Sequence, residues 1–380
     1  INIGHFVLGQ PDFLGARMGD DGDFGCSDGG QQEKCGTQQC SRDTRFHCSH
    51  RRNPLENCIE RDGVDGAIVG DWRIKKTLLR WRTIVADAFT RIDLLRSFGP
   101  QLAKAKGGAA ALGSVLQTDR SFRTRYLLQV PAGQIARGGD GEALSFLQHS
   151  LLHDDSPHVR AQAAMAAAGL PTMTPSLGRA LHDPGPRVRE AALEALGEAS
   201  AAVGPKAERQ VVVLLSKDPW TFVRAAAAGA LATRPANPMT DEALVAPLGS
   251  DDSSIVRAAI LDALGSRNSP GTIAAVRDKA DQPKESIAVR KAALQALGSM
   301  CDVDSVDLLT KLAQRAAAAQ LPYDRPLGEV ALKALGEIHP ADLQERIAPL
   351  LAPRVPTNLR RMARSVLRQP GSCPTSRTTP

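Results

Sequence analysis

Asp183-Pro-Gly-Pro-Arg-Val-Arg189, with the run Glu-Ala-Ala-Leu-Glu-Ala-Leu196 that follows it, decides the fold of this 380-residue chain. The phrase places a Val-Arg pair at its end, six residues after an aspartate. Four copies occur, over Asp154–Arg160, Asp183–Arg189, Asp218–Arg224 and Asp251–Arg257. Their arginines lie 29, 35 and 33 residues apart, and degenerate copies end at Arg290 and Arg360. A phrase that recurs at this period indicates a stack of one supersecondary unit.

Each copy of the phrase lies between two apolar segments. The alanine-rich run after it has apolar residues three and four positions apart, which predicts a helix. The segment before it, such as 144–152 or 211–215, predicts an antiparallel partner helix joined by a short turn. One hairpin cannot bury its apolar face alone, so we expect an all-α fold, an α-solenoid of stacked antiparallel helical hairpins. Four glycines are expected to stop second helices: Gly197, Gly265, Gly298 and Gly336.

This pattern resembles the HEAT-repeat family, in its short bacterial form, over about residues 142–368. The resemblance implies that the aspartates and arginines form a structural ladder along the inner turns, rather than an anion-binding site. We also expect each aspartate to cap the second helix of its unit. The ladder residues are Asp154, Arg160, Asp183, Arg189, Asp218, Arg224, Asp251, Arg257, Arg290 and Arg360.

The repeat becomes irregular toward the C-terminus. Lys284 replaces the aspartate before Arg290, and Gly328 stands where the next arginine is expected. We therefore predict that the ladder is broken from Ser286 onward and that an inserted loop lies around Ala316–Pro326. The expected organisation is an irregular extension over 1–70, basic helices and a degenerate capping repeat over 71–140, the solenoid over 141–368 and a disordered tail over 369–380.

Five of the seven cysteines crowd into the N-terminal extension, which has too little apolar periodicity to form a core. Disulfides in an exported protein are the preferred explanation. A zinc site that includes His47 and His50, or a reduced segment docked on the solenoid, are the alternatives. The localisation expected on this basis is periplasmic or extracellular, with cytoplasmic as the alternative. The disulfide candidates are Cys26, Cys35, Cys40, Cys48 and Cys58, one of which could instead reach Cys301 or Cys373.

The net charge of +6 is unevenly distributed. Residues 71–137 carry 13 Lys/Arg against 4 Asp/Glu, whereas residues 138–380 carry 27 against 26. The helix predicted from Trp72 to Phe98 is amphipathic, so it either caps the first hairpin or contacts an acidic protein, nucleic acid or a membrane surface. A near-neutral solenoid argues against a long nucleic-acid groove. The partner-binding candidates are Arg73, Lys75, Lys76, Arg80, Arg82, Arg120, Arg123 and Arg125.

Catalytic signatures are missing or lack their structural context. Gly25-Cys-Ser-Asp-Gly29 fits the nucleophile-elbow pattern, but no apolar strand precedes it. The chain has no phosphate-binding loop and no His-Glu pair of the kind that di-iron helical-repeat hydroxylases use. We therefore expect no enzyme activity, no cofactor and no metal. The predicted function is a non-catalytic scaffold that binds another protein, as a structural or accessory subunit of a larger assembly. The alternatives are a nucleic-acid-binding protein that uses residues 71–137, and an accessory subunit or lyase-like partner of an enzyme.

Overall fold

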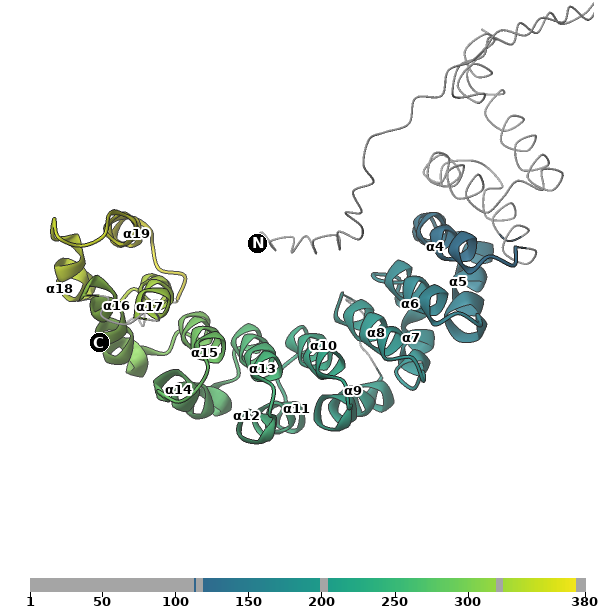
Figure 1. Ribbon diagram of the computed structural model, residues 1–380, viewed down its shortest axis with the longest axis horizontal. Helices are drawn as coiled ribbons and strands as arrows, with labels where there is room; N and C mark the ends of the chain where they lie inside the picture. Colours follow the sequence, from purple (N-terminus) through teal and green to yellow (C-terminus); the bar gives the residue numbers. More distant parts are fainter. Residues whose placement is uncertain (1–112, 114–118, 199–203, 319–323, 374–380) are drawn as a thin grey trace, which may run out of the picture. The chain divides into compact units, whose positions relative to one another are not determined.

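The computed structural model describes residues 113, 119–198, 204–318 and 324–373 (Figure 1). Every regular element in these ranges is a helix, and none of those helices has the length and apolarity to cross a bilayer. The α-helices are α4 (Phe122–Arg137), α5 (Gly141–His153), α6 (Pro157–Ala166), α7 (Thr174–Ala180), α8 (Pro186–Glu198), α9 (Pro205–Lys217), α10 (Thr221–Ala232), α11 (Pro238–Val245), α12 (Pro247–Ser250), α13 (Ser254–Arg267), α14 (Ile273–Asp281), α15 (Ile287–Ser299), α16 (Val306–Ala318), α17 (Asp324–Ile338), α18 (Leu343–Ile347) and α19 (Thr357–Arg368). Short 3₁₀ helices η2 (Pro171–Met173), η3 (Pro270–Thr272), η4 (Val303–Ser305) and η5 (Ala348–Leu351) complete the first helices of several units.

The helices form hairpins, each with a first and a second helix. α5 packs on α6, α9 on α10 and α14 on α15, across the turn that carries the repeated phrase. The second helices of successive hairpins also pack side by side, in the order α4, α6, α8, α10, α13, α15, α17 and α19 (Figure 1). We call this series the second-helix row. The all-α solenoid predicted from the repeat is therefore confirmed.

The core lies between the first helices and the second-helix row, as one continuous apolar cluster. The valine before the arginine of each phrase anchors the turn in this core, because its side chain is completely buried in five successive units. Alanine supplies much of the rest, as in α10, where Ala227 and Ala228 are both 0% exposed. Because alanine side chains are small, the backbones of neighbouring second helices can approach closely. The anchoring valines are Val159, Val188, Val223, Val256 and Val289.

Glycines in the second helices have a different role from the one expected. Gly265 lies inside α13 and Gly298 inside α15, so the expectation that they stop these helices was wrong. A Cβ at Gly265 would lie 2.9 Å from Cα of Ala296, and one at Gly298 would lie 2.9 Å from Cα of Ala334. These residues are therefore glycine because the next second helix packs against their backbone. Gly197 and Gly336 likewise lie within α8 and α17.

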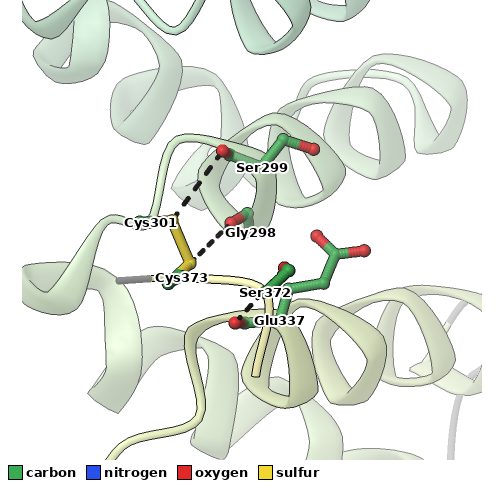
Figure 2. The surroundings of a disulfide bond; sticks show 6 residues. All are labelled: Gly298, Ser299, Cys301, Glu337, Ser372 and Cys373. Atoms are coloured by element: carbon green, nitrogen blue, oxygen red, sulfur yellow. Dashed lines mark hydrogen bonds between the residues drawn. A yellow bond between two sulfur atoms is a disulfide. The ribbon is translucent and has the colours of Figure 1, made fainter. Parts of the chain in front are cut away.

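A disulfide bond fixes the C-terminal end of the array. It joins Cys301, in the turn after α15, to Cys373, with the two Cα atoms 5.5 Å apart and a sequence separation of 72 (Figure 2). The backbone N–H groups of Ser372 and Cys373 both donate to the carbonyl oxygen of Glu337, at 3.0 and 3.1 Å. The chain after α19 thus returns across the end of α17 to reach the end of α15.

Two expected boundaries shift in the structure. The tail expected to be disordered from residue 369 begins with a segment that the disulfide and the Glu337 carbonyl hold in place as far as Cys373, and the remainder lies outside the described residues. The loop expected around Ala316–Pro326 is shorter, because α16 continues to Ala318 and α17 begins at Asp324. The residues between these helices lie outside the described ranges.

Candidate functional site

The arginine of each phrase binds the carboxylate of the next unit. Arg160 donates from Nε and Nη2 to the two carboxylate oxygens of Asp183, at 2.7 and 2.9 Å. Arg189 binds Asp218 in the same bidentate way, at 2.8 and 3.1 Å. Arg224 binds Asp251 at 2.7 and 3.0 Å. The ladder therefore joins successive hairpins in one direction, from an arginine to the acid of the following turn.

Each ladder arginine also holds its own turn. Nη1 of Arg189 donates to the backbone carbonyl of Asp183, at 2.8 Å, and to that of Pro184, at 3.2 Å. Arg160 and Arg224 donate to the carbonyls of Asp154 and Asp218 in the same way. One guanidinium thus satisfies two carbonyls of its own turn and one carboxylate of the next. Such a planar fork is the geometry that arginine offers and lysine does not.

The ladder aspartates do not cap helices in the way expected. Asp183 accepts a hydrogen bond from the N–H of Gly185, at 2.7 Å, and Asp218 from that of Trp220, at 2.9 Å. These donors lie two residues further on and precede the helix, so the aspartate closes an Asx-type turn rather than capping the first helical N–H groups. The cap prediction was therefore wrong in detail, although each aspartate lies beside the start of a second helix and binds an arginine.

Burial strengthens the charge pairing. The Asp218 side chain is 2% exposed and that of its partner Arg189 is 12% exposed. Hydrogen bonding to Asp183 raises the pKa of the Arg160 guanidinium. Burial alone would raise the pKa of Asp251, but hydrogen bonds from Arg224 and from the N–H of Ser253 lower it overall. The rungs are ion pairs largely shielded from water, and in the Arg224–Asp251 rung the hydrogen bonds favour the charged carboxylate.

The ladder extends beyond the predicted units in both directions. Lys284 stands where the ladder aspartate is expected, but the next residue, Glu285, supplies the carboxylate and binds Arg257 at 2.6 and 3.1 Å. Beyond this rung, Arg290 donates from Nε to the carbonyl of Ala280. At the other end, Arg125 binds Asp154 at 2.7 and 3.0 Å. Arg125 was predicted to bind a partner, and this assignment was wrong because its guanidinium forms the first rung among the described residues.

The other basic candidates divide into two groups. Arg120 and Arg123 are exposed beside the start of α4, with the Arg123 guanidinium 6.0 Å from the centre of the Phe122 ring. The remaining candidates lie outside the described residues: Arg73, Lys75, Lys76, Arg80, Arg82 and the cysteines at 26, 35, 40, 48 and 58.

Apolar, aromatic and basic side chains, most of them exposed to solvent, border the ladder. Trp220 is 50% exposed and contacts Phe222, with ring centroids 5.5 Å apart. The Arg187 guanidinium of the preceding unit lies 4.2 Å from the centre of the Phe222 ring. Ile255 is 65% exposed at the same place in the next unit. We call this series the turn stripe. It comprises Phe122, His158, Arg187, Trp220, Phe222, Ile255 and Ile287, each at the start of a second helix.

A second set of arginines lies at the opposite ends of the second helices, and sequence analysis missed it. Arg267, whose side chain is 0% exposed, donates to the carbonyls of Leu231 and Arg234 and to the carboxylate of Asp241. Arg137 donates to the carbonyl of Ala166. These arginines satisfy the terminal carbonyls of a neighbouring second helix. No spacing rule links them in sequence, so only the packed structure shows their common role.

Comparison with known proteins concerns the repeat region. Residues 144–232 and 242–321 match the model of a family described as HEAT repeats. A structure of human deoxyhypusine hydroxylase in complex with glycerol is 21% identical, with 71% of this chain and 98% of that chain covered and a TM-score of 0.29. The Escherichia coli protein YibA is 18% identical, with 74% and 99% covered and a TM-score of 0.48. The complex of CpcE and CpcF of phycocyanin lyase from Nostoc sp. PCC7120 is 22% identical, with 59% of this chain and 86% of that chain covered and a TM-score of 0.39. No curated protein matches the chain.

Proposed function

We propose that this chain, whose residues 144–232 and 242–321 match the HEAT-repeat family, is a non-catalytic scaffold that binds another protein along the turn stripe. The observation that carries the proposal is Trp220, half exposed beside the ladder. Tryptophan and arginine are the residues most enriched among those that dominate protein interfaces. Here they occur together, on turns that the buried ion pairs hold in fixed positions.

The turn stripe combines exposure with preorganisation. An exposed tryptophan on a mobile loop loses conformational freedom when it binds. Here the backbone N–H of Trp220 already donates to the carboxylate of Asp218, and the Trp220 ring contacts that of Phe222, with centroids 5.5 Å apart. Phe222 is held under the Arg187 guanidinium. A partner would therefore pay little entropy to order these side chains. A structural or accessory subunit of a larger assembly is the role that this surface fits best.

The experiment compares two double variants of the full-length chain. Trp220→Ala with Ile255→Ala removes the most exposed apolar groups of the turn stripe. Val213→Ala with Met239→Ala is the matched control, because these residues are 42% and 48% exposed on first helices. Tagged protein is used to capture partners from its native source after mild cross-linking, with quantification by mass spectrometry.

We expect recovery of the partner to fall about tenfold or more for the stripe variant, since truncating an aromatic residue that a partner buries at the centre of an interface costs about 2 kcal/mol or more. The control should change recovery little. Equal recovery of every captured protein with both variants would overturn the assignment of the turn stripe as the interface. Tight duplex DNA binding at physiological salt, with a steep salt dependence, would favour the nucleic-acid alternative instead.

We also propose an oxidising compartment, periplasmic or extracellular, for this protein. The support is the Cys301–Cys373 pairing, because disulfides persist mainly where glutathione does not reduce them. Rapid alkylation of intact cells followed by peptide mapping tests this. Recovery of Cys301 and Cys373 as alkylated thiols in freshly trapped protein would contradict it.

A further inference from the structure

The surface of α19 gathers arginines at helical spacing. Arg361, Arg364 and Arg368 are exposed, and Arg360 is partly buried beside them. Together with three polar neighbours they surround an open hollow of about 600 Å³. The polar neighbours are Thr357, Ser365 and Gln369. We call this surface the α19 arginine face.

The charge of the α19 arginine face is not balanced by its own sequence neighbourhood. From Arg346 to Pro380 the chain has seven arginines and no aspartate or glutamate. Within the described residues the structure gives no ion pair to Arg360, Arg361, Arg364 or Arg368. The hydrogen bonds of Arg360 go to uncharged groups, the Pro353 carbonyl and the Thr357 hydroxyl. Four guanidinium groups on one short helix repel one another, so an external anion would be bound favourably.

The position of Arg360 indicates which anion fits. Arg360 is the fourth residue of its second helix, as Arg189 and Arg224 are of theirs. Its Nη1 donates to the turn carbonyl of Pro353, seven residues earlier rather than six, at 3.2 Å, and its Nη2 donates to the Thr357 hydroxyl at 3.4 Å. In the earlier units the remaining donors of this arginine bind a carboxylate from the next turn. α19 therefore repeats the arginine half of a rung, in a position where an acidic side chain completes the pair.

The chain itself does not supply that acid from the segment after α19. The bonds from Ser372 and Cys373 to the carbonyl of Glu337, and the disulfide to Cys301, take this segment back across α17 (Figure 2). The residues from Gln369 to Pro380 contain no acidic side chain.

We propose that the α19 arginine face binds an acidic segment of a partner protein, with an aspartate or glutamate in the ladder position against Arg360. Further carboxylates at helical spacing then meet Arg361, Arg364 and Arg368. The carboxylate geometry of the earlier rungs favours this partner over a nucleic acid. In addition, α19 spans only about 18 Å, so few phosphates of a strand could contact it at once. This surface is distinct from the turn stripe and does not depend on it.

The test uses the full-length chain and a fluorescent helical peptide about as long as α19, with Asp and Glu on one face. The same peptide with Asn and Gln in place of the acids is the uncharged control. Arg361→Glu with Arg364→Glu reverses two charges of the arginine face. Lys206→Glu with Arg209→Glu is the matched control variant, because these exposed residues have the same spacing and the same change in net charge, on α9.

We expect binding of the acidic peptide at physiological salt to weaken about tenfold or more in the R361E/R364E variant, because two attractive pairs become repulsive. Binding should change less than about twofold in the K206E/R209E variant. Arg360→Lys keeps the charge but loses the bidentate fork, so it should weaken binding several-fold, whereas Arg361→Lys should not. Circular dichroism shows whether each variant remains folded.

Three results would overturn the proposal. The first is equal binding of the acidic and uncharged peptides, and the second is equal loss in the two charge-reversal variants. The third is tighter binding of a single-stranded oligonucleotide of matched length that the R361E/R364E variant abolishes, which would assign the arginine face to nucleic acid. Failure of these tests leaves the assignment of the turn stripe unaffected, because its variants lie on other helices.

Discussion

Asp218 offers the sharpest test of the ladder, because it has the most buried carboxylate among the Asp–Arg rungs. It accepts hydrogen bonds from Nε and Nη2 of Arg189 and from the backbone N–H of Trp220. Replacement by alanine leaves the N–H unsatisfied and leaves the Arg189 guanidinium, 12% exposed, without its counter-charge. Breaking a buried pair by removing one partner typically costs 3–5 kcal/mol, and the small residual exposure places this one near the lower end, at about 3 kcal/mol.

Asp218→Asn removes the charge of this side chain but keeps its size and shape. The amide oxygen can still accept a hydrogen bond from the backbone N–H of Trp220, so we expect a smaller loss of stability, about 1–2 kcal/mol. Asp252→Ala is the control, since Asp252 contacts Arg224 at 3.3 Å but its side chain is 96% exposed. An exposed pair of this kind contributes at most about 0.5 kcal/mol.

Native-state hydrogen exchange is the appropriate assay, because repeat arrays often do not unfold in a single two-state step. The opening free energy of the amides in α9 and α10 should fall by the amounts given for the Asp218 variants. Amides in α16 and α17, several units away, should change much less. A loss below about 1 kcal/mol for Asp218→Ala, or one equal to that of Asp252→Ala, would refute the view that buried rungs hold the hairpins in register.

Three further predictions concern stability. Replacing Cys301 and Cys373 by serine should lower the free energy of unfolding by up to about 4 kcal/mol, measured by urea unfolding with and without reductant; equal curves for wild type and variant would contradict it. Because the folded pKa of Asp251 is below its unfolded value, its contribution is present above about pH 4 and is lost as the pH falls through the folded pKa. Asp251→Asn should therefore make the free energy of unfolding fall less steeply between about pH 5 and pH 3, and an unchanged dependence on pH would contradict the lowered pKa of Asp251. Gly265→Ala should cost about 1–3 kcal/mol because its Cβ would meet the backbone of α15, whereas Gly229→Ala, with nothing within 4 Å, should stabilise by about 0.5–1 kcal/mol; equal effects would contradict the close-packing argument.

The sequence predicted the helices and their pairing because the necessary signals are local. The helical spacing after Val188 and the turn residues between Asp183 and Arg189 are each read within a few positions. The repetition of these signals predicted the stacking. The ladder partner of each arginine required one further step, from units to neighbouring units, and only the packed structure shows that Arg189 binds Asp218 rather than the aspartate of its own phrase.

Features that depend on distances between units were missed. A glycine near the end of a helix is typical of a C-cap, and nothing within α13 indicates that Gly265 is pressed against Ala296. The partnership of Cys301 and Cys373 spans 72 residues, and no spacing pattern links the two. Both depend on where the next helices lie, which periodicity alone does not determine.

Sequence analysis missed the α19 arginine face for a different reason, because net charge was averaged over a long segment. Residues 138–380 are almost neutral as a whole, but the acids lie before Arg346 and the last seven arginines lie from there onward. A charge count over one or two helices would have found them. The direction of the ladder then adds what the count cannot, since each rung runs from an arginine to the acid of the following turn. Arg360 is the fourth residue of α19, as Arg189 is of α8 and Arg224 of α10, so its guanidinium lies at the place from which the earlier rungs bind a carboxylate.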